Sequence, residues 1–335
     1  MLSVDFINVG YGDSILARDT GEGERGPFTL LIDSGDTNTG AAYPNSCRIN
    51  AADFLKQEGV TEIDVLLLTH LHRDHIGGLP KIIENTVVKE LWTNYIPDFP
   101  TGKTEVRQGT HWDDAGKDTA FSLNLYLDIL EKLRATGTIF RVLNSTVTPS
   151  FSKRIGERFF IECAFADSIL YRRQNELAAD IFSRKKNTVD TKDEYLYNKI
   201  KNLNSILNDS SIRVTLKHKD TVIALPGDVS ASSWLRNQPK KCTVLKIPHH
   251  GHRDGMSEEL VSFLRPEYFV LSVSNDRKDA CPHSDSVAII KKYAKKCFVT
   301  DALSIPLVAE KKFHSSVRFK FEDGIIFAGS HRCRV

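Results

Sequence analysis

The sequence lacks the features that mark membrane, secreted and strongly charged proteins. No stretch approaches the roughly 20 apolar residues needed to span a bilayer. The N-terminal segment MLSVDFINVGYGDS carries two acidic residues and no long apolar run, so it is neither a signal peptide nor a membrane anchor. The 45 basic and 43 acidic residues give a formal net charge of +2, so no global field indicates nucleic acid or a membrane surface. We therefore expect a soluble, cytoplasmic protein.

Paired cysteines and internal repeats are also absent from the sequence. The six cysteines stand at positions 47, 163, 242, 281, 297 and 333, with no CxxC pair among them. This scatter indicates reduced thiols rather than a disulfide framework or a cysteine-rich zinc site. At 335 residues, with 41% apolar and 26% charged side chains, the chain is long enough for one large core that carries an insertion.

Short apolar runs separated by Gly, Asp and His predict strands and helices at both ends of the chain. Before residue 97 the expected strands are 4–9, 14–17, 28–32 and 64–68, and the expected helices are 51–58 and 78–84. After residue 211 the expected strands are 212–217, 221–225, 244–247, 268–273 and 298–300, the expected helices are 257–264 and 284–294, and a last hairpin joins 316–321 to 324–328.

The middle of the chain, residues 97–207, has a different pattern. It predicts a polar loop at 98–117, an amphipathic helix at 121–134, a strand at 159–164 and charged, mostly helical sequence at 168–207. No spacing of catalytic residues stands out there. We interpret 97–207 as a partly helical insertion that shapes the substrate cleft of a single domain, residues 1–335.

The segment DVLLLTHLHRDHIGGL, residues 64–79, carries the strongest chemical signal. A buried apolar strand ends at Thr69, and three histidines and one aspartate follow within six residues. A rigid strand end can aim several side chains of the following loop at one point, and imidazole with carboxylate suits Zn, Mn or Fe. With this spacing, His70 and His72 can share one cation while Asp74 and His75 reach a second.

Two later segments supply what a two-metal site needs. Asp228 ends a strand in LPGD, where a carboxylate can bridge two cations about 3.5–4 Å apart. The segment LKIPHHGH, residues 245–252, places His249 and His250 at another strand end, and either of them can complete the second metal. Each segment alone is ambiguous, because GD is common in turns and histidine pairs are common on surfaces.

Two further aspartates follow strands near the N-terminus. Asp33, in TLLIDSG, can orient a ligand histidine without binding the metal itself. The alternative is an ordinary turn aspartate before glycine. For Asp13, in GYGDS, the turn and the functional interpretation are evenly balanced.

The order of these motifs resembles the metallo-β-lactamase superfamily, and within it the soluble hydrolase domain of ComEC-type DNA-uptake proteins. The matching segments are VGYGDS (9–14), LIDSG (31–35), LTHLHRDHIGG (68–78), SIRVTLKHKDTVIALPGD (211–228) and LKIPHHG (245–251), with Asn275 and His283 beyond them. They cover the core, residues 1–96 and 208–300. The resemblance implies a four-layer αββα sandwich with two divalent cations, Zn or Mn. Its ligands would be His70, His72, Asp74, His75, Asp228 and one of His249 and His250.

The chain departs from the superfamily in two places. Most members add a third histidine to the first metal, where this chain has Asn208–Asp209–Ser210. Asn208, Asp209 or water would then complete that metal, since neither His111 nor His218 is well placed. The family's HP segment stands here in reverse order, as CPHS, so a catalytic role for His283 in phosphate contact or proton donation is a hypothesis.

The resemblance implies hydrolysis through a hydroxide bound by two metals, with Asp74 as a metal ligand that can also accept a proton. A phosphodiester substrate, DNA or RNA, is favoured by the ComEC-type branch, and the basic clusters at 172–173 and 184–186 can contact phosphates. Interleaved acidic residues favour a solvated helix face for those clusters instead. The alternatives are a hydrolase of a small ester, lactone, thioester or cyclic nucleotide, and an inactive binding scaffold. A diiron oxidoreductase is disfavoured, because such proteins carry an acidic residue at the position of His72.

Overall fold

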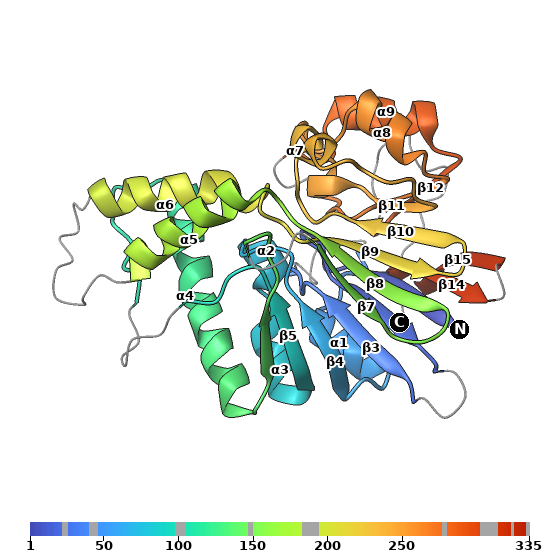
Figure 1. Ribbon diagram of the computed structural model, residues 1–335, viewed down its shortest axis with the longest axis horizontal. Helices are drawn as coiled ribbons and strands as arrows, with labels where there is room; N and C mark the ends of the chain where they lie inside the picture. Colours follow the sequence, from blue (N-terminus) through green and yellow to red (C-terminus); the bar gives the residue numbers. More distant parts are fainter. Residues whose placement is uncertain are drawn as a thin grey trace.

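Two mixed β-sheets packed face to face form the centre of the protein (Figure 1). The computed structural model describes residues 1–21, 26–39, 46–97, 105–146, 150–182, 194–276, 280–301, 314–322 and 325–332. Within these residues the sheets have eight and seven strands, and we call them sheet A and sheet B.

Sheet A combines the chain's N-terminal strands with its C-terminal hairpin. In spatial order its strands are β15 (Ile325–Arg332), β14 (His314–Glu322), β1 (Leu2–Ile7), β2 (Ile15–Asp19), β3 (Phe28–Ile32), β4 (Glu62–Leu67), β5 (Val87–Thr93) and β6 (Ile139–Val142). The strands from β3 to β6 pair in parallel, and the others pair antiparallel.

Sheet B is built from strands that lie between residues 150 and 299. In spatial order its strands are β13 (Lys296–Val299), β12 (Tyr268–Leu271), β11 (Val244–Lys246), β10 (Thr221–Leu225), β9 (Arg213–His218), β8 (Phe159–Ala164) and β7 (Ser150–Arg154). The strands from β10 to β13 pair in parallel, and β7 to β10 pair antiparallel.

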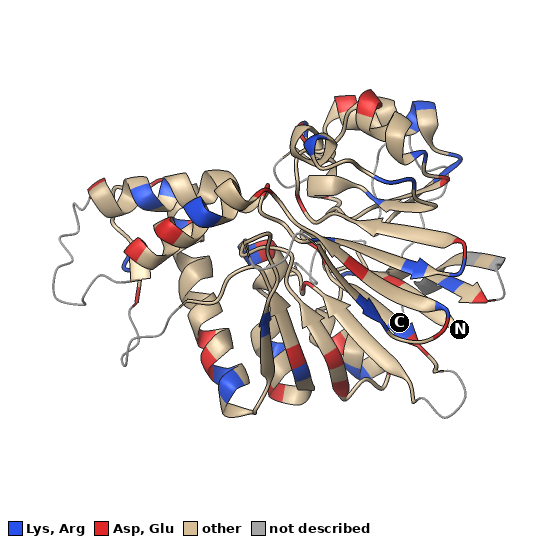
Figure 2. Ribbon diagram, viewed as in Figure 1, with Lys and Arg blue, Asp and Glu red and all other residues tan. Residues whose placement is uncertain are grey.

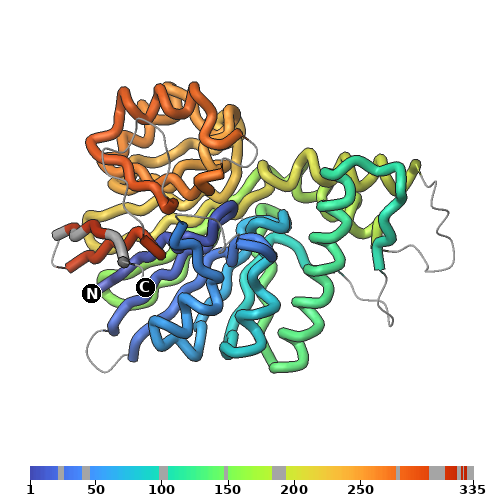
Figure 3. Tube along the Cα trace, turned by 180° about the vertical axis from the view of Figure 1, so that it is seen from behind, coloured from blue at the N-terminus to red at the C-terminus, as the bar shows by residue number. Residues whose placement is uncertain are grey.

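Helices cover the outer faces of both sheets. Against sheet A lie α1 (Ala51–Gln57), α3 (Leu79–Asn85) and α4 (Asp114–Ala135), and α5 (Ser168–Phe182) and α6 (Glu194–Leu207) join the same apolar cluster beside α4. Against sheet B lie α7 (Ala231–Arg236), α8 (Glu258–Leu264) and α9 (Ser284–Tyr293). Figure 3 shows from behind that the two groups of helices lie on opposite sides of the sheets. The predicted αββα sandwich is therefore confirmed.

Alternating side chains of the strands explain why the sheets need cover on both faces. In β4, for example, Val65 and Leu67 belong to the apolar cluster between the sheets, while Leu66 between them belongs to the cluster that contains α1 and α3. All three side chains are fully buried. Such continuous apolar runs are typical of parallel strands that are covered on both faces.

Several predicted elements are correct to within two residues, including β2, β3, α1 and β10. Three strands and two α-helices were missed, namely β5, β6, β7, α2 (Arg73–Ile76) and α7. The helix α4 begins at Asp114, seven residues before its predicted start, because the Asp113 carboxylate caps it by accepting from the Gly116 amide. The predicted loop at 98–117 is therefore wrong for its last four residues, and its first seven lie outside the described residues.

Part of the region 97–207 belongs to the layers of the sandwich, and part of it lies outside them. Its helix α4 packs on sheet A, β6 forms an edge of sheet A, and β7 and β8 belong to sheet B. The helices α5 and α6 extend beyond the sheets at one end of the molecule (Figure 1). The proposed boundaries of the insertion stay a prediction.

The cysteines only partly follow the expectation of reduced thiols. Cys163, Cys242, Cys281 and Cys297 are free, but Cys47 is disulfide-bonded, and its partner lies outside the described residues. Among the residues that the structure describes, no helix is both long and apolar enough to cross a membrane.

Candidate metal centre

The predicted site residues lie where the carboxyl ends of strands from both sheets meet. In sheet A the parallel strands β3, β4 and β5 end at one edge, and in sheet B the parallel strands β10 and β11 do the same. The main chain joins the two edges, because the Ile212 amide donates to the Thr69 carbonyl at 2.9 Å. The loops that follow these strands therefore converge on one place.

The loop after β4 turns its first two histidines toward each other. Nε2 of His70 lies 3.1 Å from Nδ1 of His72. The Thr69 hydroxyl donates its hydrogen to Asp33, so in its 3.1 Å contact with His70 it accepts from Nδ1–H. On the other ring, Nε2–H of His72 donates to Asn204 Oδ1 at 2.9 Å. The two nitrogens that face each other are then both unprotonated acceptors. A cation bound by both nitrogens would remove the repulsion between these two acceptors.

Asp228 lies at the centre of the second group of side chains. Its Oδ2 atom is 3.2 Å from Nε2 of His75 and 3.3 Å from Nε2 of His250. Asp74 approaches the same histidines, with its Oδ2 atom 3.7 Å from Nε2 of His75 and 3.3 Å from Nε2 of His250. We call Asp74, His75, Asp228 and His250 the cluster. The His70 ring joins it, with a centroid 4.1 Å from that of His75.

Hydrogen bonds behind the cluster fix the orientation of its histidines. Nδ1 of His75 lies 2.7 Å from Asp33 Oδ2, and Nδ1 of His250 lies 3.1 Å from the Ser272 carbonyl. Asp33 also accepts from the Thr69 amide, at 2.8 Å. With Nδ1 protonated toward these acceptors, each ring directs its Nε2 atom at the cluster. The structure thus places Asp33 where a residue that orients a ligand histidine is expected.

Lys246 is a member of the site that the sequence analysis missed. It is fully buried, and its ammonium group forms an ion pair with Asp13 and lies 3.4 Å from Asp228 Oδ1. The available signal was a lysine between two apolar residues in LKI, because a buried strand rarely contains an unpaired charge. For Asp13 the turn and functional interpretations were evenly balanced. The neighbouring Gly12 lets this turn pack directly against the loop of Asp74, because the Cβ of any other residue at position 12 would lie 2.0 Å from the Asp74 carbonyl oxygen.

The buried charges shift the pKa values of the cluster strongly. Burial raises the pKa of Asp228, but His250, His75 and Lys246 outweigh it and hold that pKa well below its usual range. Burial lowers the pKa of His250, but Asp228 outweighs it and raises the pKa to about 9. The pKa of His75 is also raised well above 6.5, by Asp228, Asp74 and Asp33 against the effect of burial. Without a metal, these histidines are cations that neutralise the carboxylates.

The donor atoms suit divalent cations. Ligand atoms of Asp13, His75, Asp228 and His250 all lie within 4.8 Å of one another, and all four side chains are buried. Nε2 of His250 is buried 3.3 Å from one carboxylate oxygen each of Asp74 and Asp228. Imidazole nitrogens and carboxylate oxygens at one point form the usual donor set for zinc and manganese. The residues present therefore fit a metal centre, and the assignment of individual ligands stays a prediction.

The two adjacent histidines of LKIPHHGH have different environments. His250 points into the cluster, whereas Nδ1 of His249 lies 2.8 Å from Asp254, which also contacts His252 at 2.9 Å. Both histidines have left-handed backbone, with φ near 50°, and this turn separates their side chains. Of the two candidates left open by the sequence, the structure brings His250 to the cluster.

Two of the predicted residues are turned away from the cluster. The oxygens of Asp209 accept from the Ser230 amide at 3.0 Å and the Ser233 hydroxyl at 2.6 Å, so this carboxylate holds the start of α7, and its role in completing the first metal stays a prediction. The His283 side chain caps α9, accepting from the Asp285 amide at 3.3 Å, and does not join the cluster. Its predicted catalytic role has no support in this geometry.

A cavity of about 230 Å³ opens beside the cluster. Its walls come from the metal-binding loops and from α4 and α6: Tyr11, Asp36, His72, Arg73, Asp74, Ala115, Asp118, Thr119, Ser122, Asn204, Asn208, Asp228 and His249. Asn208 is the one member of the predicted Asn–Asp–Ser turn in this wall, and its buried Oδ1 atom has no hydrogen-bond partner. Asn204 was missed by the sequence analysis, because a single asparagine on an amphipathic helix gives no signal.

We expect the metal-free protein to lose stability as pH rises from about 6.5 to about 9. His75 and His250 have pKa values raised above those of an unfolded chain. A raised pKa gives stability that is complete below the unfolded value and is lost as pH rises through the folded value. Urea midpoints at pH 6.5, 7.5 and 9 in EDTA measure this loss. A midpoint that rises with pH under these conditions contradicts the assignment of charged histidines.

Comparison with known proteins places these observations in a family. The model of the metallo-beta-lactamase superfamily matches residues 9–274. The endoribonuclease ysh1 of Schizosaccharomyces pombe is 28% identical over 83 residues, which are 25% of this chain and 10% of that enzyme. The metallo-beta-lactamase fold protein YhfI from Bacillus subtilis is 10% identical, with a TM-score of 0.43 over 89% of this chain and 95% of YhfI. Zn(2+)-bound PqqB from Methylobacterium extorquens is 12% identical, with a TM-score of 0.42 over 89% of this chain and 97% of PqqB.

Proposed function

Because this chain belongs to the metallo-β-lactamase superfamily, whose model matches four fifths of it, we propose that it is a metal-dependent phosphodiesterase acting on DNA or RNA. The observation that carries the proposal is the cluster, in which Asp228 lies between His75 and His250 at 3.2 and 3.3 Å. Such an arrangement of buried imidazoles and carboxylates serves metal-assisted hydrolysis.

The residues divide into groups that would hold two cations. His70 and His72 would hold the first and Asp74, His75 and His250 the second, with Asp228 shared. When bound, the cations supply Lewis acidity, which activates water and neutralises the charge that develops on a phosphoryl group.

The protein's own groups prepare this site for the reaction. Asp33 and the Ser272 carbonyl keep the Nε2 atoms of His75 and His250 directed inward. Asp74, which faces the cavity, can accept a proton from the attacking water.

Two observations favour a phosphodiester substrate. The relative with 28% identity is an endoribonuclease, although this chain spans only a tenth of its length. The helices α5 and α6 carry basic residues at Arg172, Arg173 and Lys199, but Figure 2 shows acidic residues interleaved with them. This interleaving makes the basic residues the weaker support. The resemblance to ComEC-type domains stays a prediction that points the same way.

A hydrolase of a small ester, lactone, thioester or cyclic nucleotide is the second candidate. The cavity beside the cluster holds only about 230 Å³, and its one arginine, Arg73, is already paired with Asp36 at 3.0 Å and Asp118 at 2.8 Å. A narrow cavity whose walls carry several carboxylates, with no unpaired arginine or lysine among its described lining residues, favours a small substrate over a nucleic acid strand.

We expect the purified full chain, loaded with Zn or Mn, to cleave single- or double-stranded DNA or RNA. An Asp74→Asn variant should lose at least about a hundredfold in rate, because it removes a charged group from the reacting centre. Asp118→Asn is the matched control: it also lines the cavity but lies outside the cluster, so its rate should stay close to that of the parent.

Metal quantitation accompanies these assays. Cleavage of a small ester or cyclic nucleotide without any cleavage of nucleic acid would support the second candidate and refute the first. A metal content below one equivalent, with no hydrolysis of either kind, would indicate a binding scaffold.

A further inference from the structure

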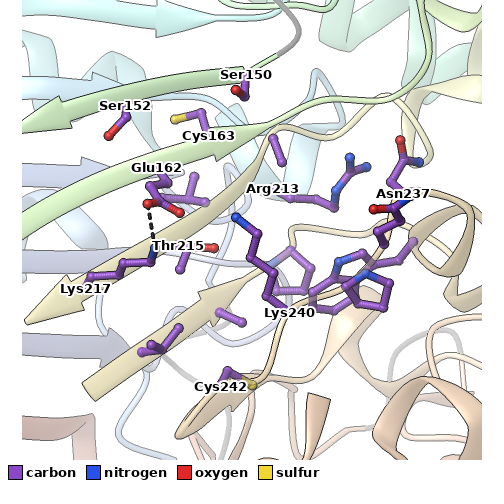
Figure 4. A pocket seen from close by; sticks show the side chains of 18 of the residues that line it. Ser150, Ser152, Glu162, Cys163, Arg213, Thr215, Lys217, Asn237, Lys240 and Cys242 are labelled. Carbon is purple, nitrogen blue, oxygen red and sulfur yellow. Dashed lines mark hydrogen bonds and ion pairs between the residues drawn. The ribbon is translucent and has the colours of Figure 1, made fainter. Parts of the chain in front are cut away.

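A second cavity, of about 530 Å³, lies on the outer face of sheet B (Figure 4). Its floor is formed by outward-facing side chains of β7, β8, β9 and β10, and its wall by the end of α7 and the segment 237–242. Among the described residues, none lines both this cavity and the one beside the cluster. It is therefore separate from the candidate metal centre.

An incompletely paired arginine lies in this cavity. Arg213 is only 4% exposed, and Figure 4 shows it at the same end of the cavity as Asn237. One guanidinium nitrogen, Nη2, donates to the Phe165 carbonyl, but the buried Nη1 has no hydrogen-bond partner. Burial lowers the pKa of Arg213, and the nearby Tyr171 and Asp209 offset this effect only in part, because no carboxylate forms an ion pair with the guanidinium within the described ranges. A buried, unsatisfied guanidinium is a strong recognition group for an anion.

The remaining charged side chains also leave an excess of positive charge. Lys217 is neutralised by Glu162, at 2.6 Å, and Glu162 is the only acidic residue in the lining. Lys240 and Lys241 belong to the wall, and within the described ranges neither has an ion pair. Figure 4 shows Lys240 reaching over the floor. Three unneutralised cations around one cavity favour a group with more than one negative charge, such as phosphate.

The other walls provide an apolar surface beside these charges. Trp234 lines the cavity together with Val222, Pro226 and Pro239. A volume of several hundred Å³ with an apolar wall and a few convergent polar groups is typical of sites for small organic ligands. An inorganic phosphate ion would leave most of this space and the apolar wall unused.

We propose that this cavity is a binding site for a small organic phosphate of the size of a mononucleotide. The phosphate pairs with Lys240 in the positive field of the buried Arg213 guanidinium, and a flat ring packs against Trp234 and Val222. This assignment is independent of the phosphodiesterase proposal, because it uses none of the cluster residues.

Calorimetric titration of the full chain with AMP, adenosine and inorganic phosphate tests the site. We expect saturable AMP binding with a dissociation constant on the order of 1 mM or tighter, and binding of adenosine and of phosphate at least about tenfold weaker. Lys240→Glu should weaken AMP binding by about tenfold, since it reverses a charge at the phosphate. Lys56→Glu, the same charge change on α1, should leave AMP binding unchanged.

Asp74→Asn separates this site from the candidate metal centre and should also leave AMP binding unchanged. The proposal is overturned if AMP does not bind, if Lys240→Glu binds it as the parent does, or if phosphate alone binds as tightly. Loss of AMP binding in Asp74→Asn with retention in Lys240→Glu would place the nucleotide at the cluster instead. Binding of an oligonucleotide without binding of AMP would assign this face to nucleic acid and equally refute the proposal.

Discussion

Metal-free Lys246→Met is expected to have a free energy of unfolding about 3–5 kcal/mol lower than the parent protein. The Lys246 ammonium group is fully buried between the carboxylates of Asp13 and Asp228. Its removal takes the ion-pair partner from Asp13 and one of the three cationic neighbours from Asp228, and both carboxylates stay buried. Methionine fills a similar volume, so the loss reports charge rather than packing. Urea unfolding in EDTA measures it.

Two further variants separate this effect from a general loss of stability. Asp13→Asn combined with Lys246→Met removes one of the unpaired carboxylates and should restore part of the lost stability. Lys217→Met breaks the partly exposed pair with Glu162 and should cost at most about 1 kcal/mol. Added divalent cation should stabilise Lys246→Met more than the parent, because it replaces a missing positive charge. Equal losses for Lys246→Met and Lys217→Met would show that the buried ion pair has little effect.

The local parts of this site are predictable from the sequence, whereas its long-range parts are not. The four ligand candidates of the loop after β4 lie within six residues, so their spacing alone brings them together. Asp228 and Asp33 were found because each follows an apolar run and precedes a turn. The environment of Lys246 depends on how β11 sits beside β10 and the turn at Asp13, and no local pattern encodes that arrangement.

Fold prediction failed where charged side chains interrupt an apolar pattern. The strand β5 was missed because Lys89 and Glu90 break its apolar run. In the structure Lys89 pairs with Asp64 at 2.9 Å and Glu90 with Arg141 at 2.8 Å, so neighbouring strands satisfy these charges. A sequence read one segment at a time does not show such cross-strand partners.

Asp228→Asn is expected to reduce hydrolysis by about a thousandfold, or about 4 kcal/mol in the activation barrier. The Asp228 carboxylate lies within 3.4 Å of groups on His75, His250 and Lys246, and in the proposed function it would be the ligand that both cations share. Asparagine keeps the shape but removes the charge. We expect bound metal to fall from two equivalents to one or fewer, measured by atomic absorption on the same samples used for rates.

Asp209→Asn is the matched control for this substitution. The Asp209 carboxylate precedes Asp228 by 19 residues, but its oxygens bind Ser230 and Ser233 rather than the cluster. Its loss should weaken the start of α7 and lower the thermal midpoint while leaving metal content unchanged. The opposite result, with metal lost in Asp209→Asn and retained in Asp228→Asn, would mean that the Asn208–Asp209–Ser210 turn completes the site after a rearrangement. Asp228 would then act through its ion pair with Lys246 and not as a shared ligand.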